Sequence, residues 1–126
     1  MTVLIDSWAW IEFFLGSGAG KVVSGHIDSD QDLIISAINI AEVYRWILRY
    51  YDESTADEKK CAMLDRCTLI NVDENIAVEA ARIRNTLKWG LCDSIVYATA
   101  KQEGAKVLTG DSDFRGKEDV LFIDRS

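Results

Sequence analysis

The stretch "TVLIDSWAW", residues 2–10, places one carboxylate between a strand-forming run and a run of aromatic residues. Thr, Val and Ile favour an extended backbone, and apolar side chains at successive positions are typical of a strand covered on both faces. The run ends at Asp6. A carboxylate at the end of a buried strand is costly unless it has a partner, so Asp6 indicates a functional edge of the sheet.

The rest of the chain alternates between short β-rich runs and longer helical segments. Four further runs have a strand-forming composition: DLIIS (32–36), TLINV (68–72), KVLTG (106–110) and VLFID (120–124). The segments between them carry apolar residues at helical spacing, for example Ile40, Tyr44, Ile47, Leu48 and Tyr51. This alternation predicts an α/β fold, a three-layer α/β/α sandwich around a mainly parallel sheet of four or five strands.

Length and composition predict a single domain over residues 1–126. The chain has no proline, and its glycine-rich point, GSGAG at residues 16–20, predicts a turn between helices. Its three cysteines lack a C-x-x-C spacing, which indicates neither a disulfide framework nor a zinc site. No apolar run reaches the roughly 18 residues of a membrane span. We therefore expect a cytoplasmic protein with no membrane partner.

Acidic residues follow the predicted strands at the points where ligands bind. Ligands of open parallel sheets lie beyond the carboxyl ends of the strands, so acids that follow different strands can meet there. Several carboxylates in one cleft repel each other unless cations neutralise them, and an all-oxygen ligand set suits Mg²⁺ or Mn²⁺. The sequence therefore predicts a metal site built from five acids: Asp6, Glu42, Asp93, Asp111 and Asp113.

Taken alone, most of these acids also have a simpler explanation. Asp93 stands where it could cap a helix, and Glu42 lies three residues before Arg45, the spacing of an exposed ion pair. Asp111 and Asp113 could form turns beside glycine. All of these explanations would have to hold at once to dismiss the site.

The motifs that hold these acids resemble a known family. They are LIDSWAWIEFF (4–14), INIAEVYR (38–45), GLCDSIVYATA (90–100) and VLTGDSDF (107–114). In this order they resemble the PIN-domain nucleases, and more narrowly the VapC toxins of prokaryotic toxin–antitoxin pairs. The resemblance covers nearly the whole chain. It departs after Ser7, where many members have a second small polar residue and this chain has Trp8.

The resemblance implies roles for individual residues. Asp6, Glu42 and Asp93 would be acidic ligands, the T-x-D-x-D-F element would offer Asp111 and Asp113, and Ser7 and Thr109 would support them by hydrogen bonds. The implied activity is metal-dependent endoribonuclease hydrolysis of RNA phosphodiester bonds, with Mg²⁺ or Mn²⁺ as the cofactor.

The net charge of −7 by itself argues against a polyanionic ligand. Two bound divalent ions would add +4 and reverse the field at the cleft. Arg84 and Lys88, four residues apart on a predicted helix that leads toward Asp93, are candidate phosphate contacts, and a solvated helix face is the alternative.

Aromatic residues indicate an interface. Two predicted helices carry more large apolar side chains than a small core readily absorbs: Trp8, Trp10, Phe13, Phe14, Trp46, Tyr50 and Tyr51. The resemblance implies two uses for them, a homodimer and a groove that the C-terminal segment of a cognate antitoxin fills. We expect Trp10 and Trp46 to be exposed members of this set.

Two other functions are consistent with parts of the sequence. A receiver-like signalling domain is also doubly wound and binds Mg²⁺, but it requires adjacent acids after the first strand and leaves Glu42 and Asp93 unexplained. An inactive PIN-like domain that only binds a partner is the other alternative, and the full acidic set argues against it.

Overall fold

The computed structural model describes residues 1–124, which form five strands, six α-helices and one 3₁₀ helix. In chain order the first half contains β1 (Thr2–Ile5), α1 (Ser7–Leu15), α2 (Gly18–Ile27), β2 (Asp32–Ser36), α3 (Ala37–Tyr50) and α4 (Glu53–Arg66). The second half contains β3 (Thr68–Ile70), α5 (Glu74–Leu87), α6 (Leu91–Gln102), β4 (Lys106–Thr109), η1 (Ser112–Phe114) and β5 (Val120–Phe122).

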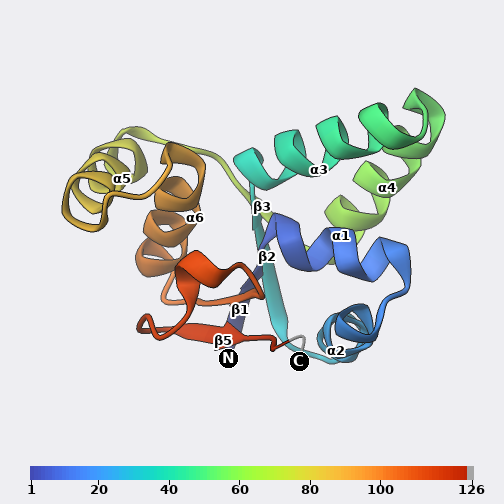
Figure 1. The fold of residues 1–126 in the computed structure, drawn as a ribbon, viewed down its shortest axis with the longest axis horizontal. Helices are drawn as coiled ribbons and strands as arrows, with labels where there is room; N and C mark the ends of the chain where they lie inside the picture. The colour runs from blue at the N-terminus through green and yellow to red at the C-terminus, as the bar shows by residue number, and fades with distance from the viewer. Residues whose placement is uncertain (125–126) are drawn as a thin grey trace.

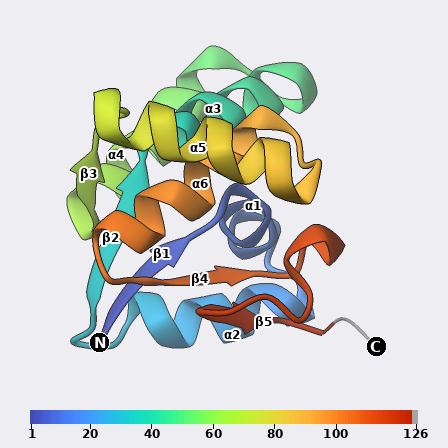
Figure 2. The same cartoon turned by 90° about the vertical axis from the view of Figure 1, so that its left-hand side faces the viewer.

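All strand pairs in the sheet are parallel, and the strand order is β3-β2-β1-β4-β5 (Figures 1 and 2). In the central strand, Val3 pairs in register with Leu33 of β2 and with Lys106 of β4. The chain leaves β1 toward β2 on one side and later returns to β4 on the other, which makes the carboxyl end of β1 a topological switch point. The predicted α/β/α sandwich is confirmed.

Two hydrophobic cores lie on opposite faces of the sheet. Val3 and Ile5 point into one core, which α1 to α4 cover, and Leu4 points into the other, which α5 and α6 cover. Figures 1 and 2 show these helix groups on either side of the strands. Successive side chains of a strand point to opposite faces, so coverage of both faces explains why the first strand is apolar at consecutive positions.

A tight turn joins α1 to α2. Gly16 ends α1 with a left-handed φ of 69°, and the side chain of Ser17 accepts a hydrogen bond of 3.0 Å from the backbone of Gly20. The turn predicted over residues 16–20 is therefore confined to Gly16 and Ser17, and the other three residues begin α2. Within residues 1–124 no helix is both long and apolar enough to span a membrane.

The buried face of α3 differs from the predicted stripe. Its buried residues are Asn39, Val43 and Ile47, whereas Leu48 is 46% exposed and Tyr51 is 59% exposed. The stripe predicted from Ile40 and its apolar partners is thus offset by about one residue, or roughly 100°. The apolar pattern could not include Asn39, whose side chain is buried because its amide is hydrogen-bonded.

Candidate acidic metal centre

Asp6 lies at the switch point and is 4% exposed. It occupies the N-cap position of α1, but its side chain does not cap the helix. Its Oδ2 atom accepts a hydrogen bond of 2.9 Å from Thr109 Oγ1, and its Oδ1 atom accepts one of 3.3 Å from Asn39 Nδ2. Burial raises the pKa of Asp6 to about 6, against the opposing effect of the Thr109 hydrogen bond. The fold therefore fixes this carboxylate in a place where its charge is costly.

Asn39 is a residue of the site that the sequence prediction missed. It is fully buried and connects Asp6 to Glu42, the two acids that we call the inner acids. Its Nδ2 atom also donates to Ser7 Oγ at 2.9 Å, and Ser7 Oγ donates to Glu42 Oε1 at 2.7 Å. Its Oδ1 atom accepts from the backbone N–H of Ser36 at 3.1 Å. A polar residue three positions after a strand-ending serine is the pattern of a capping box, and that signal could have identified Asn39.

The outer acids are Asp93, Asp111 and Asp113. One carboxylate oxygen from each lies within 4.8 Å of the others. Asp93 is in the first turn of α6, whose N-cap is Gly90, so the helix-capping explanation of Asp93 is wrong. Asp111 does act as a turn former, since its side chain accepts a hydrogen bond of 3.0 Å from the backbone N–H of Asp113. Capping by Asp111 is compatible with its place in the cluster.

Electrostatic coupling extends over all five acids. Burial raises the pKa of Asp93 to about 7, and the next contributions come from the charges of Asp111, Asp6, Asp113 and Glu42, in that order. The ion pairs among the described residues include none of these acids. In particular, the Glu42–Arg45 pair expected from helical spacing is not among them, and Glu42 accepts its hydrogen bond from Ser7 instead.

This donor set fits a hard divalent cation. The ligand atoms are carboxylate oxygens, which Mg²⁺ and Mn²⁺ prefer, and the mutual repulsion that raises the pKa of Asp93 is the repulsion that a cation relieves. The rim of the cluster is accessible, because Asp93 and Asp111 are half-buried and Asp113 is exposed.

Trp8 packs against the loop that carries two of the outer acids, Asp111 and Asp113. A Cβ atom added to Gly110 would lie 2.3 Å from Cη2 of the Trp8 indole, so the ring lies directly against the backbone of Gly110. Gly110 precedes Asp111, whose backbone N–H donates to Thr109 Oγ1 at 3.1 Å. The aromatic residue that departs from the family pattern thus packs beside the acidic loop.

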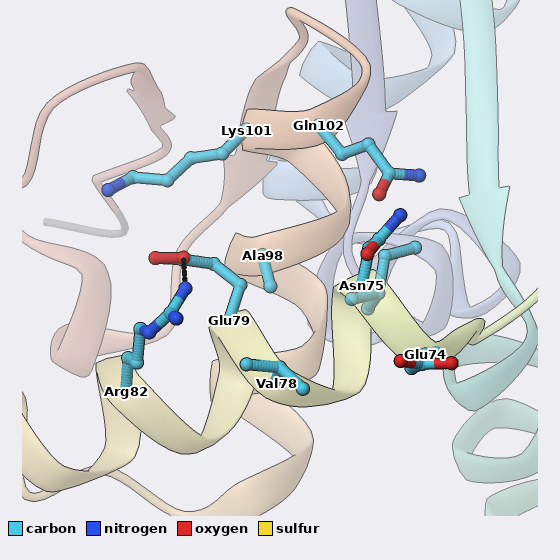
Figure 3. A pocket seen from close by; sticks show the side chains of 9 residues that line it. Glu74, Asn75, Val78, Glu79, Arg82, Ala98, Lys101 and Gln102 are labelled. Carbon is cyan, nitrogen blue, oxygen red and sulfur yellow. Dashed lines mark ion pairs between the residues drawn. The ribbon is translucent and has the colours of Figure 1, made fainter.

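The candidate phosphate contacts lie outside the cluster. Arg84 and Lys88 are exposed and line a pocket of about 490 Å³ together with Trp89 and Leu91, which closely precede Asp93. A second pocket, of about 690 Å³, lies between α5 and α6 (Figure 3). It is lined by other residues, among them Glu79 and Arg82, which form an ion pair of 3.5 Å.

The aromatic residues are less exposed than predicted. Trp10 is 1% exposed, so the expectation that it is accessible is wrong. Trp10 is buried because α2, α3 and the sheet cover α1 on several sides. Its indole also packs against Phe13 and Phe14, with ring centroids 5.9 and 5.7 Å away. Trp46 is half-buried, whereas Tyr50 and Tyr51 are each 59% exposed.

Both the sequence and the fold are similar to those of known proteins. A family model described as "PIN domain" matches residues 3–119, and a comparison with curated protein sequences found no match. Among solved structures, a toxin–antitoxin complex from Klebsiella pneumoniae is similar, with 26% identity, a TM-score of 0.77, and coverage of 94% of this chain and 95% of that chain.

Two further solved structures show the same fold. VapBC2 from Rickettsia felis, bound to a DNA fragment from its promoter, has 15% identity and a TM-score of 0.79 over 98% of this chain and 100% of that chain. The sarcin-ricin loop cleaving toxin VapC20 from Mycobacterium tuberculosis has 14% identity and a TM-score of 0.72 over 89% of this chain and 92% of that chain.

Proposed function

Because the chain belongs to the PIN domain family, we propose that it is a metal-dependent endoribonuclease and the toxin of a VapBC-type toxin–antitoxin pair. The observation that carries this proposal is the gathering of five acids at the switch point, where the pKa of Asp6 is raised to about 6 and that of Asp93 to about 7. In a nuclease of this kind the carboxylates bind metal cations and are not neutralised by ion pairs with lysine or arginine.

The inner and outer acids have different proposed roles in metal binding. Asp6 and Glu42 are held by hydrogen bonds from Thr109, Asn39 and Ser7, which gives a metal ion fixed oxygen ligands. Asp93, Asp111 and Asp113 close the site at its accessible rim. When bound there, Mg²⁺ or Mn²⁺ supplies Lewis-acid activation of water and stabilises the departing oxygen.

RNA is the proposed substrate, and the cytoplasm is the proposed location. The fold similarity to a sarcin-ricin loop cleaving toxin supports this substrate class. Arg84 and Lys88 lie on the exposed surface that leads to the N-terminal turn of α6, where they are available to contact phosphates beside the scissile bond. Single-stranded segments suit such a site, because their bases and backbone are accessible.

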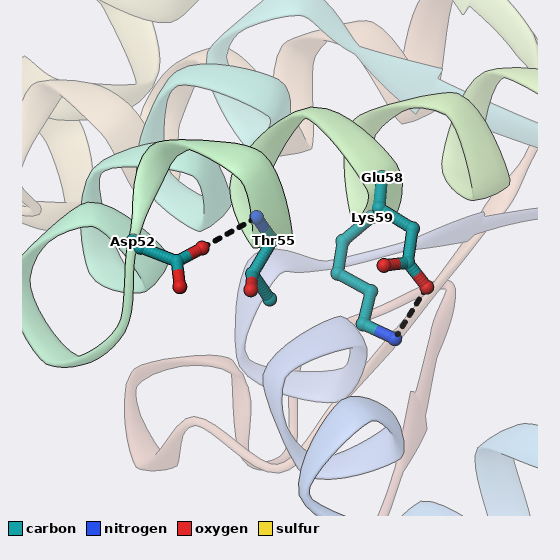
Figure 4. Close-up of polar contacts among 4 residues, drawn as sticks. All are labelled: Asp52, Thr55, Glu58 and Lys59. Atoms are coloured by element: carbon teal, nitrogen blue, oxygen red, sulfur yellow. Dashed lines mark hydrogen bonds and ion pairs between the residues drawn. The ribbon is translucent and has the colours of Figure 1, made fainter.

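An antitoxin is the proposed protein partner. Between α1, α3 and α4 lies a small pocket of about 130 Å³, whose apolar lining includes Phe14, Leu15, Trp46 and Tyr51. On α4, Asp52 caps the helix by accepting a hydrogen bond from the backbone N–H of Thr55, and Lys59, which lines the pocket, lies 3.6 Å from Glu58 (Figure 4). An amphipathic antitoxin segment could place an apolar anchor there and a basic side chain on the acids. Solved complexes of similar fold contain toxin and antitoxin together.

A homodimer is also proposed. Leu48 and Tyr51 leave apolar area exposed near the C-terminal end of α3, and patches of this kind mark interfaces. Sedimentation of the purified chain at micromolar concentration tests this, and a monomer would contradict it.

The decisive experiment is a cleavage assay on labelled single-stranded RNA with Mg²⁺, with Mn²⁺ and with EDTA. We expect cleavage with either metal, complete loss after chelation, and recovery when metal is restored. Equal cleavage in excess EDTA would contradict the metal mechanism. A protein that binds an antitoxin but never cleaves RNA would instead be the inactive PIN-like module.

A further inference from the structure

A groove beside the acidic cluster has a composition that differs from the rest of this acidic chain. It has a volume of about 440 Å³ and runs along α3 to the start of α6, and its lining includes Glu42, Arg45, Trp46, Arg49, Tyr50 and Cys92. The groove is continuous with the cluster at two points. Glu42 belongs to both, and Cys92 directly precedes Asp93.

At this junction Glu42 of α3 and Cys92 of α6 line the groove together. A ligand that reaches the acids from this side therefore passes over Glu42 and Cys92, and what lies further along the groove determines which ligand that is.

Two guanidinium groups lie along the groove without acidic partners. Arg45 and Arg49 are exposed, and the ion pairs found among residues 1–124 include neither of them. The Arg49 guanidinium lies 5.6 Å from the centre of the Tyr50 ring. In a chain with 21 acidic and 14 basic residues, such groups are available for an anionic ligand.

Two aromatic rings lie beside these cations. Trp46 and Tyr50 have ring centroids 5.1 Å apart with planes tilted by 48°, and Tyr50 is 59% exposed. Arg45 and Arg49 are four residues apart, and so are Trp46 and Tyr50, so a cationic row and an aromatic row run side by side along the helix. Alternating phosphate and base groups are the ligand chemistry that matches two such rows.

We propose that this groove holds the single-stranded RNA segment next to the phosphate that lies at the acidic cluster. Arg45 and Arg49 contact backbone phosphates, and bases stack on Tyr50 and the exposed part of Trp46. From Glu42 to Tyr50 the helix axis extends about 12 Å, enough for a short segment. This inference rests on the proposed ribonuclease function, because it takes the scissile bond to lie at the acids.

Fluorescence anisotropy with a fluorescein-labelled single-stranded RNA tests the groove without cleavage, if every protein carries Asp93→Asn. We expect Arg45→Ala with Arg49→Ala to raise Kd by roughly tenfold and to reduce the slope of log K against log salt by about 1.4, since each single-strand contact contributes about 0.7. The matched control is Lys21→Ala with Arg82→Ala, which removes the same charge from exposed positions on α2 and α5 and should leave Kd and the slope unchanged.

A second pair of variants tests stacking. Tyr50→Ala should raise Kd about fivefold or more, whereas Tyr50→Phe, which keeps the ring, should bind like its parent. Thermal melting of each variant verifies that it is folded. In cleavage assays on protein that keeps Asp93, Tyr50→Ala should raise KM and leave kcat nearly unchanged.

The outcomes separate this inference from the proposed function. If the unmodified chain cleaves RNA while the groove variants bind and cleave RNA as the control variants do, the groove inference is wrong and the proposed function stands. If the parent does not cleave RNA but the groove variants lose RNA affinity, the function is wrong and the groove is an RNA site. Variants that keep RNA affinity but lose self-association or antitoxin binding would also overturn the groove inference.

Discussion

The inner and outer halves of the acidic cluster are built in different ways. Both carboxylate oxygens of Asp6 accept side-chain hydrogen bonds, and Glu42 accepts one from Ser7. Around Asp93 the main influences after burial are the charges of neighbouring acids. The inner acids are thus positioned by the folded chain itself, whereas the outer acids repel one another, and a bound cation would relieve that repulsion. Loss of Asn39, which positions the inner acids, and loss of Asp93, an outer acid, should therefore have opposite effects on stability.

Asp93→Asn should produce the largest effect on activity. It removes a proposed metal ligand, so we expect RNA cleavage to fall more than about 100-fold, while the metal-free protein melts at the same or a higher temperature because repulsion is relieved. Cleavage assays and thermal melts in metal-free buffer measure both effects.

The control is Asp32→Asn, an exposed aspartate at the opposite end of β2. It should leave both activity and melting temperature unchanged. An Asp93→Asn protein that is much less stable than the metal-free parent would show that Asp93 is a structural partner rather than a crowded charge.

Asn39→Ala should affect stability in the other direction. It removes the hydrogen bonds of Asn39 to Asp6 Oδ1, to Ser7 Oγ and to the backbone N–H of Ser36, and buried groups that lose a partner cost about 1–3 kcal/mol. We expect the free energy of unfolding to fall by about 2–3 kcal/mol in urea titrations, and activity to fall as Asp6 and Glu42 lose their fixed positions. A neutral result would mean that water replaces the Asn39 amide and that the inner half is not organised by it.

Gly110→Ala tests how the outer acids are positioned. The added methyl group would overlap the Trp8 ring, so either the ring or the acidic loop must move, at a cost of about 1–3 kcal/mol. The same substitution in a Trp8→Ala protein should cost less, and this double-mutant cycle isolates the contact. Equal costs in both backgrounds would show that Trp8 does not support the loop.

The fold was predictable because its signals are local. The three inner strands β1, β2 and β4 are short apolar runs buried at consecutive positions, whereas the edge strands β3 and β5 are less buried. A carboxylate after the first strand must lie at the sheet edge. The sequence pattern therefore predicted both the sandwich and the gathering of acids on one edge.

Other features depend on tertiary contacts and were not predictable. The apolar pattern of α3 could not show that the polar Asn39 faces inward, because its burial depends on hydrogen bonds to residues 32 and 33 positions away. Similarly, composition could not show which aromatic of α1 is enclosed, and Trp10 is. The start of α6 lies two residues before Asp93, a boundary error of the size that helix ends commonly show.

A pH dependence of stability is also expected in the metal-free protein. In the folded state the pKa of Asp6 is raised from 3.8 to about 6 and that of Asp93 from 3.8 to about 7. Between pH 4 and pH 7 the folded chain therefore binds more protons than the unfolded chain, so the free energy of unfolding decreases as pH rises through this range. We expect the melting temperature in metal-free buffer to fall by several degrees between pH 5 and pH 7.5.

Two comparisons assign this pH dependence to the cluster. Asp6→Asn with Asp93→Asn should show a weaker decrease, and what remains reports the repulsion among the other acids of a chain with a net charge of −7. Adding Mg²⁺ should stabilise the parent at pH 7.5 and much less at pH 5, because the ion binds the ionised carboxylates and competes with protons. A metal-free parent that becomes more stable as pH rises from 5 to 7.5 would mean that both halves of the cluster are stabilised by partners within the fold, and the contrast between them would not hold.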